Sequence, residues 1–324
     1  MMHIRLFDRP EQDRPITALG LLLAGVLVLA LQDTMVKLFS DATSFWQFQV
    51  IRSIFNTLFV VMLAYASNGI GILWPKKPFY VFLRAFFLSI CMLFFFGAVT
   101  EISVTQMAAG LYTYPLFVTL LASPILGEKI GIWRVTALLI GAAGSFIVLN
   151  PLADDFKWLQ LMPVIAGFFY ACNILTLRRY CRNESPLALA LGVSTTFIIF
   201  GVAGSIVMAL IPIAAETRAI APFVLVSWPE LTAFVLGFCI IASVINLMGN
   251  IFLSRAYQTA DSSLLAPMDF SYLVFMALWG KLLFDAWPTT NAALGMILIA
   301  AAGVITAIRE NRHRLRPIKP GRGI

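Results

Sequence analysis

Long apolar runs, separated by short polar breaks or by breaks that contain Pro or Gly, recur along almost the whole chain. A run of about 20 apolar residues is long enough to cross the roughly 30 Å hydrocarbon core of a bilayer as a helix. Reading each break as a helix end predicts ten membrane-spanning helices. Their approximate bounds are 16–38, 44–66, 79–100, 104–126, 131–149, 158–180, 187–213, 229–254, 262–284 and 291–308. The pattern therefore predicts an all-α integral membrane protein.

The connections between these runs are mostly short, so helices that are neighbours in sequence are expected to pack antiparallel. The longest connection, 211–230, contains several prolines and is expected to be an interfacial loop. Phe45, Trp46 and Phe48 come at the start of the second helix. Aromatic residues at a helix end are typical of the belt that membrane proteins place at the lipid–water interface, and we expect that role here.

Composition supports lipid as the solvent of this chain. Charged residues make up 12% of the sequence and the mean hydropathy is +0.89, whereas soluble domains carry about 25% charged residues. The polar, mixed-charge segment 1–15 lacks the short apolar core and small-residue cleavage site of a signal peptide. We therefore expect 1–15 to be a tail and the first apolar run to be retained as a span.

The positions of the basic residues favour ten spans and set an orientation. With the N-terminus in the cytoplasm, ten spans return the C-terminal segment 309–324 to the same side. This arrangement puts 18 of the 23 Lys and Arg residues on the cytoplasmic side, as the positive-inside rule requires. We expect a multi-pass protein of the bacterial inner membrane with both tails cytoplasmic. The net charge is +7, but most Lys and Arg residues lie at helix ends and do not form a basic surface. No nucleic-acid partner is therefore expected.

Several kinds of chemistry are not expected. The two histidines, His3 and His313, lie near the ends of the chain, and the four cysteines show no metal-ligand or redox spacing. No phosphate-binding loop of the GxxxxGK[ST] type occurs. We predict no cofactor, no metal site and no catalytic residues. An intramembrane enzyme would have to use Asp33 and Asp269 as a dyad, and we expect these two acids near opposite membrane faces.

The loop near 150–157 divides the chain into two segments of five spans, 16–150 and 151–308. Because five is odd, a second copy of the first segment enters the membrane in the opposite orientation. Shifting the sequence by 157 positions aligns 103–129 with 260–286, and Glu128 then falls on Asp285. We predict two inverted five-helix repeats with a substrate site between them.

The sequence at this point resembles the drug/metabolite transporter superfamily, EamA type. The resemblance rests on PLFVTLLASPILGEKIGIWRVTALLIGAAGSFIVLNP, on LLFDAWP, and within the first segment on Leu126-Gly127-Glu128-Lys129, Gly141, Gly144 and Asn150-Pro151. It covers about residues 17–308 and implies a ten-helix carrier with a central site. The second half departs from the family pattern. It reads Phe284-Asp285 instead of Gly-Glu, and Pro267 is displaced and followed by Asp269, which therefore inherits no family role.

Charges inside the first two spans also resemble a subgroup of this family. Asp33, Lys37, Gln49, Arg52 and Ser53 look similar to positions in importers of vitamins and nucleoside-like metabolites, including riboflavin and S-adenosylmethionine carriers. Asp33 and Lys37 are four residues apart, so they share a helix face and are able to pair. Two interpretations remain open for these residues with Arg52. One is an ionic cluster that fastens two helices, and the other is a gate or wall that recognises substrate.

Asp269 is the most distinctive acid, because it lies inside the ninth predicted helix with no cation near it in sequence. A charge in an apolar span is costly unless it is paired or functional. Asp269 is therefore either a capping or hydrogen-bonding residue at a kinked helix or a site residue, and Arg84 is a candidate partner across the bundle. Asp33 and Asp269 are our candidates for proton coupling.

Polar side chains in other spans complete the candidate site. Tyr112 and Tyr114 are two apart in a helix and so are expected to point in different directions, while Pro115 frees a backbone carbonyl. Amides in spans join helices or line cavities. The candidate substrate-binding or gating residues are Asp33, Lys37, Gln49, Arg52, Arg84, Tyr112, Tyr114, Asn173, Asn246, Asn250, Asp269 and Tyr272. Glu128, Lys129 and Asp285 are expected to be structural.

These features together predict a secondary active transporter that moves a small polar or amphipathic organic metabolite by alternating access. Such a metabolite would be an amino acid, a vitamin or a nucleoside-like molecule. The expected partners are that small molecule and the lipid bilayer, with the chain acting as a monomer or a homodimer. The alternatives are a non-catalytic membrane scaffold and an intramembrane enzyme.

Overall fold

The computed structural model describes residues 15–67, 69–126, 132–152, 156–259 and 265–314. Every regular element in these ranges is a helix, which confirms the all-α fold class. The elements are α1 Pro15–Phe39, α2 Phe45–Ala66, η1 Ile70–Leu73, α3 Pro78–Gly97, α4 Val104–Leu111, α5 Tyr114–Leu126, α6 Ile132–Leu149, η2 Trp158–Leu161, α7 Met162–Tyr180, α8 Pro186–Leu210, α9 Ala215–Ile220, α10 Pro222–Leu225, α11 Ala233–Thr259, η3 Ala266–Phe270, α13 Ser271–Phe284 and α14 Thr290–Arg314.

Each predicted span falls on one helix or on two consecutive helices of the described chain. Seven spans are long and apolar enough to cross a membrane by themselves. Helices α6 and α14 contribute the shorter apolar stretches Val135–Leu149 and Thr290–Ile305. The ninth predicted span is formed by the 3₁₀ turn η3 followed by the 14-residue helix α13. The described residues thus contain seven candidate spans and two shorter apolar helices.

The fourth and ninth spans were predicted as continuous helices, and the structure interrupts both. Helix α4 ends at Leu111 and α5 begins at Tyr114. Pro115 explains the new start, because its fixed φ suits the first turn of a helix and its missing N–H is not needed there. The hydroxyl of Thr113 donates to the carbonyl oxygen of Gly110 at 2.6 Å and satisfies one group that the break exposes. Breaks in corresponding spans of the two halves are typical of transporter binding sites.

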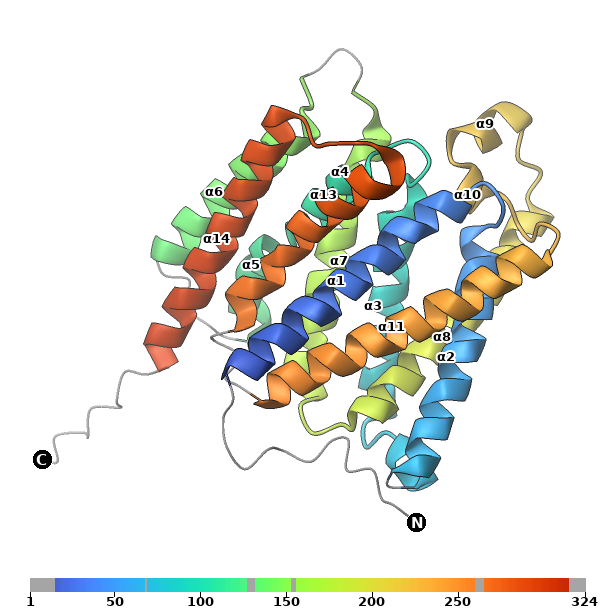
Figure 1. Cartoon of the computed structure of the whole chain (residues 1–324), viewed down its shortest axis with the longest axis horizontal. Coiled ribbons are helices and arrows are strands. Elements are labelled where there is room, and N and C mark those ends of the chain that lie inside the picture. Colours follow the sequence, from blue (N-terminus) through green and yellow to red (C-terminus); the bar gives the residue numbers. More distant parts are fainter. Residues whose placement is uncertain (1–14, 68, 127–131, 153–155, 260–264, 315–324) are drawn as a thin grey trace, which may run out of the picture.

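The helices pack in a reciprocal pattern (Figure 1). Helix α1 packs on α11, and α3 packs on α7, so the first span of each half contacts the third span of the other. Corresponding spans of the two halves also contact one another: α2 with α8, α4 with α13, and α6 with α14. The α6–α14 pair forms one edge of the bundle, and α1 begins at the same end of the molecule at which α14 ends.

Glycines allow the closest helix crossing in this pattern. A Cβ atom added at Gly144 in α6 would lie 2.7 Å from the carbonyl oxygen of Gly295 in α14, and one added at Gly295 would lie 2.5 Å from the carbonyl oxygen of Gly144. Only glycine permits backbones to approach this closely, as in other membrane helix pairs. The glycine-rich fifth span therefore has a packing role.

The outer surface of the bundle is strongly apolar. Large hydrophobic side chains such as Ile199, Phe234, Leu282 and Ile297 are each more than 60% exposed. A soluble monomer rarely leaves so much contiguous apolar surface in water. The exposed side chains are those that face hydrocarbon in a membrane, because lipid replaces a protein partner around spanning helices.

The connection 211–230 forms a cover over the start of α2 and contains α9 and α10. We call residues 221–229 the strap. The Trp46 indole donates to the carbonyl oxygen of Val224 at 2.7 Å, and the Gln47 amide donates to that of Pro229 at 2.7 Å. Phe45, Trp46 and Phe48 are no more than 5% exposed. The expected interfacial belt at these residues is therefore wrong, because the strap and the neighbouring helices bury their rings.

Candidate functional site

A cavity of about 480 Å³ lies among α1, α2, α3, α7, α8 and α11 and reaches the breaks in the fourth and ninth spans. Nine of the twelve predicted site residues line it: Asp33, Arg52, Arg84, Tyr112, Tyr114, Asn246, Asn250, Asp269 and Tyr272. The cavity has a size typical of small-molecule sites and combines an apolar wall with a few polar groups, as such sites do.

The lining residues show which end of the bundle the cavity faces. On α2 they run from Arg52 to Leu63 near the end of the helix, and on α8 they run from Phe197 back to Pro186 at its first residue. The end of α2 and the start of α8 lie at the same end of the bundle as the start of α1, which is the lower end in Figure 1. The cavity therefore extends from the middle of the bundle toward that end.

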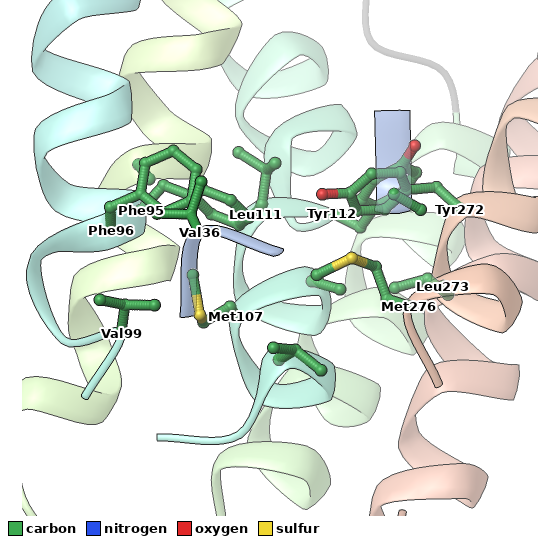
Figure 2. Close-up of a cluster of buried hydrophobic side chains, with 14 of the residues drawn as sticks. Val36, Phe95, Phe96, Val99, Met107, Leu111, Tyr112, Tyr272, Leu273 and Met276 are labelled. Atoms are coloured by element: carbon green, nitrogen blue, oxygen red, sulfur yellow. The ribbon is translucent and has the colours of Figure 1, made fainter. Parts of the chain in front are cut away.

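Aromatic and aliphatic side chains fill the opposite end. Figure 2 shows Val36, Phe95, Phe96 and Met107, each about one helical turn beyond a cavity-lining residue of its helix. All four are at most 1% exposed. Farther along, the ring of Phe39 stacks on that of Phe238 with centroids 3.7 Å apart. No described residue beyond this packing lines the cavity, so the cavity is closed at that end.

Asp33 lies at the inner part of the cavity and accepts two hydrogen bonds. The hydroxyl of Tyr272 in α13 donates to its Oδ2 at 2.7 Å, and the amide of Gln32 donates to its Oδ1 at 2.9 Å. These bonds satisfy the carboxylate away from bulk water. The bond from Tyr272 also ties α1 to α13, which belongs to the second half of the chain.

Arg52 is 4% exposed and is held between two aromatic rings and two glutamines. Its guanidinium lies over Phe48 and Phe197, at 5.1 and 5.7 Å from the ring centroids. Its terminal nitrogens donate to Oε1 of Gln49 at 2.7 Å and to Oε1 of Gln32 at 3.5 Å.

Gln32 joins the acid to the base in this cluster. It donates to Asp33 and accepts from Arg52, and it also accepts from the Asn246 amide in α11 at 2.8 Å. The opposite charges of Asp33 and Arg52 are therefore linked through a neutral amide. Hydrogen-bonded linkage of this kind reduces the cost of burying both charges.

Asp269 contacts both tyrosines of the fourth-span break. The Tyr112 hydroxyl donates to the Asp269 backbone oxygen at 3.0 Å, and the Tyr114 hydroxyl donates to its Oδ2 at 3.3 Å. We expected the two tyrosines to diverge, as they would in a continuous helix. The break between α4 and α5 instead brings both to one residue.

The two acids line the same cavity, which corrects the expectation that they lie near opposite faces. The ring of Tyr112 stacks on that of Tyr272, with centroids 5.1 Å apart and planes 13° apart. These tyrosines lie side by side at one edge of the cluster in Figure 2. They connect the surroundings of Asp33 with those of Asp269. Asp269 lies in η3, the 3₁₀ turn that precedes α13, and lines the cavity from there.

Four other candidate residues form two hydrogen-bonded pairs, Arg84 with Asn173 and Asn250 with Asn246. The Arg84 Nε donates to Oδ1 of Asn173 at 2.9 Å, so Asn173 holds an arginine that lines the cavity without lining it itself. The amide of Asn250 donates to the backbone oxygen of Asn246 at 2.8 Å, one turn earlier on α11. These two asparagines therefore lie on one face of α11 and contact each other.

Lys37 lies away from the cavity. Its ammonium donates to the backbone oxygens of Val99 at 2.9 Å and of Ile102, in the turn between α3 and α4. The suggested pair with Asp33 does not form, because these carbonyls take the ammonium and Tyr272 and Gln32 take the carboxylate. Gln49 likewise does not line the cavity, although it contacts Arg52.

Of the predicted structural residues, the structure describes Asp285. Asp285 adopts a left-handed conformation after α13 and bonds to Lys281, and this bond lowers the pKa of its fully exposed carboxyl. Glu128 and Lys129 lie outside the described residues. The described part of the chain contains no group of three or more potential metal-binding side chains.

Sequence reasoning missed four residues of the site: Gln32, Asn56, Tyr170 and Phe197. Gln32 bridges the charged pair, and the other three line the cavity. The position of Gln32 beside Asp33 in an apolar span was a usable signal. Phe197 had none, because a phenylalanine in an apolar helix gives no sign of which neighbour it will meet.

Comparison with known proteins shows that the chain is similar to bacterial metabolite transporters. The EamA-like transporter family matches residues 16–150. The chain is 28% identical to a riboflavin transporter of Vibrio cholerae serotype O1 over 66% of either chain. It is 25% identical to a riboflavin transporter of Rhizobium johnstonii over 93% of either chain. It is 22% identical to an S-adenosylmethionine uptake transporter of Rickettsia felis over 93% of this chain and 96% of that one.

A solved crystal structure of another protein has the same fold. It matches with a TM-score of 0.58 at 16% identity, covering 91% of this chain and 98% of the other. The family match, the transporter relatives and the apolar helices identify a small-metabolite transporter rather than an enzyme. Residues 16–150 of this multi-pass α-helical protein therefore match the EamA-like transporter family, and the comparisons support the drug/metabolite transporter superfamily for the chain.

Proposed function

We propose that the chain carries its metabolite by alternating access, as a secondary transporter whose substrate site is the cavity containing Asp33, Arg52 and Asp269. The single observation that supports this most is the shape of the cavity. It has polar groups at mid-depth, faces one end of the bundle, and is blocked by packed aromatic rings at the other. A carrier in one of its two end states requires this combination of features.

The moving parts are the two segments 16–150 and 151–308, acting as inverted five-helix repeats. Reciprocal packing of the first and third spans supports this division, as does the position of a break in each fourth span. Rocking of one repeat against the other would close the present opening and separate the opposite end.

The cavity of this state faces the cytoplasm, with both ends of the chain on that side. Support comes from the basic residues, 18 of 23 of which fall on the side at which α1 begins. The membrane is the bacterial inner membrane. Relatives that carry riboflavin or S-adenosylmethionine support a vitamin-like or nucleoside-like metabolite as the substrate.

Cysteine labelling tests the cavity and its orientation without a known substrate. One variant keeps only Cys239, which is buried near Arg52. A second carries Asn250→Cys in a chain freed of its native cysteines. A membrane-impermeant maleimide should label Asn250→Cys at least about tenfold faster in inverted vesicles than in intact cells, and should leave Cys239 unlabelled. Equal labelling of Asn250→Cys from both faces would contradict a cavity that is closed at one end.

Transport itself is tested in proteoliposomes with a panel of labelled metabolites and gradients in both directions. A scaffold would take up none of them and would gain no thermal stability from any. Asp33 and Asp269 are the proposed proton-coupling residues, because both are acids that line the cavity. Replacing both by Asn should remove the pH dependence of uptake. Unchanged pH dependence in the double variant would rule out coupling through these acids.

A further inference from the structure

Arg84 lines the cavity with a guanidinium group that is only partly bonded. Its Nε donates to Oδ1 of Asn173 at 2.9 Å, and Arg84 makes no other hydrogen bond or ion pair with a described residue. Neither of its terminal nitrogens is among the buried, unpaired atoms of the described chain, so both keep accessible surface. Because Arg84 lines the cavity, a molecule that enters can meet this free edge of the guanidinium.

The other arginine that lines the cavity, Arg52, has no such free edge. Its terminal nitrogens donate to Gln49 and Gln32, and Gln32 in turn donates to Asp33. The opposite charges of Arg52 and Asp33 are therefore satisfied within the protein. No acid of the described residues is linked to Arg84 in this way, and its positive charge is left without an anionic partner.

Arg84 lies between the opening of the cavity and its polar centre. Helix α3 follows α2 through the short helix η1, so it begins at the end of the bundle that the cavity faces. Arg84 is about 9 Å along α3 from its first residue, whereas Asp33 is about 27 Å along α1 from the start of that helix. Leu88 and Met92 continue the wall of the cavity inward from Arg84. A molecule on its way to the centre therefore passes this arginine.

Asn173 fixes the direction of the free edge. It is buried in α7, between Tyr170 and Leu177, which both line the cavity. A long basic side chain near a helix end otherwise extends toward water. The bond that Asn173 accepts from Nε instead holds the guanidinium at the contact of α3 with α7. The two terminal nitrogens remain together on the side away from that bond.

Two parallel N–H donors on a planar cation match the two oxygens of a carboxylate or a phosphate, which arginine binds in a bidentate manner. A neutral carbonyl group would not compensate the charge. An ionised group inside a membrane span is costly, and one without a protein partner is by default a candidate for function. The free edge of Arg84 is therefore suited to the anionic end of a ligand.

We propose that Arg84 anchors an anionic group, a carboxylate or a phosphate, of the transported metabolite, and that Asn173 is the positioning residue of this anchor. The inference rests on the proposed transport function and narrows its substrate class to metabolites with an anionic end. The rest of the metabolite extends past Leu88 toward Asp33.

Chemical modification of arginine tests the anchor without knowledge of the metabolite. Phenylglyoxal reacts with accessible guanidinium groups, and peptide mass spectrometry gives the rate at each arginine of the full chain, purified in a nonionic detergent. About 20 mM acetate or inorganic phosphate should slow the reaction of Arg84 at least about threefold, because a bound anion protects in proportion to its concentration over Kd. Protection by only one of them supports the anchor and assigns its anion as a carboxylate or a phosphate.

Three controls accompany this measurement. Acetamide has the shape of acetate without the charge and should not protect Arg84. Sodium chloride of equal ionic strength accounts for screening and should not protect it either. Arg218 on the exposed helix α9 should react at the same rate with and without the anions. Failure of both anions to protect Arg84, or equal protection by acetamide or of Arg218, would overturn the proposal.

Variants of α7 test the positioning role of Asn173. In Asn173→Leu the guanidinium is no longer oriented, so protection of Arg84 should fall below about 1.5-fold while the protein still melts cooperatively. Thr176→Val is the matched control, since Thr176 is buried nearby on α7 and bonds only to the Cys172 backbone oxygen; it should keep the full protection. Full protection in Asn173→Leu would reject the positioning role.

The outcome is separable from that of the transport proposal. Cysteine labelling at positions 239 and 250 requires no anion. One-sided labelling combined with unprotected Arg84 would retain the carrier and reject the anchor. Two-sided labelling combined with protection of Arg84 would retain the anchor and reject the carrier mechanism.

Discussion

Arg52 shows how a buried charge is retained in this protein. Its side chain is 4% exposed, and a lone guanidinium there would be costly to keep out of water. Two glutamine oxygens, two aromatic rings and a linked aspartate compensate that cost. Each of these partners requires the planar, forked shape of arginine rather than positive charge alone.

Replacing Arg52 by Lys should therefore damage the protein although the charge is kept. A lysine cannot reach both glutamines and stack between Phe48 and Phe197 at once, so we expect a loss of about 1–3 kcal/mol of stability and reduced transport. Thermal unfolding in detergent micelles gives the measurement. Arg218→Lys on the exposed helix α9 is the control and should change stability by less than about 0.5 kcal/mol. Equal melting of the two variants would contradict this account of Arg52.

For Asp285 we expect substitution to have only a small effect on stability, in contrast to Arg52, because the Asp285 side chain is fully exposed. Lys281 lowers the pKa of its carboxyl, so the pair adds stability above the ordinary aspartate pKa of about 3.9 and loses it as the pH falls below that value. Solvent and salt screen an exposed pair. Asp285→Asn should therefore melt within about 1 °C of the wild type from pH 5 to pH 8. A larger difference that disappears in high salt would show that the pair matters more than its exposure implies.

At the scale of whole elements, the decisive features are the two broken spans and the glycine crossings. The break in the fourth span brings together side chains that a continuous helix would separate: Tyr112 and Tyr114 meet at Asp269. At the edge of the bundle, α6 and α14 approach so closely that each backbone occupies the space of the other's missing Cβ. The distance between α6 and α14 is therefore set by the lack of a side chain at Gly144 and Gly295.

Gly144→Ala should loosen the edge pair. Its Cβ would lie 2.7 Å from the backbone oxygen of Gly295, which cannot move unless α14 shifts. We expect a loss of about 1–3 kcal/mol, read as a lower melting temperature. Gly20→Ala in α1 is the control, since nothing lies within 4 Å of the added atom. Better helix propensity should leave it unchanged or raise its stability by up to about 1 kcal/mol. A stabilised Gly144→Ala would mean that the helices are farther apart.

At the scale of the whole molecule, the end opposite the opening is held by stacked rings and by the strap. Phe238 of α11 stacks on Phe39 of α1 and lies 5.7 Å from the ring of Phe48 in α2. Helices α1 and α2 belong to the first segment and α11 to the second. These contacts must separate if the bundle opens at that end, so they set part of the free-energy difference between the two states.

Phe238→Leu should shift the population toward opening at that end, because it removes ring stacking between the segments. The native Cys239, kept as the only cysteine, reports the change. In intact cells a membrane-impermeant maleimide should label it at least about threefold faster than in the unsubstituted chain. Phe146→Ala, at a side chain that is 52% exposed on the outer face of α6, is the control and should have no effect. Unchanged labelling of Cys239 would show that the stack is not part of a gate.

The sequence alone determined the class of this protein and the location of its spans, because crossing a bilayer requires local runs of apolar residues that are visible without any tertiary contact. It also identified the acids and arginines of the site, since charge in such runs is rare. Tertiary structure decided how they are used. Gln32 meets residues that lie 20 and 214 positions away, and Lys37 leaves Asp33 for backbone oxygens more than 60 positions distant. Contacts between residues so far apart in sequence depend on how the helices pack, and the hydropathy of the sequence does not reveal that packing.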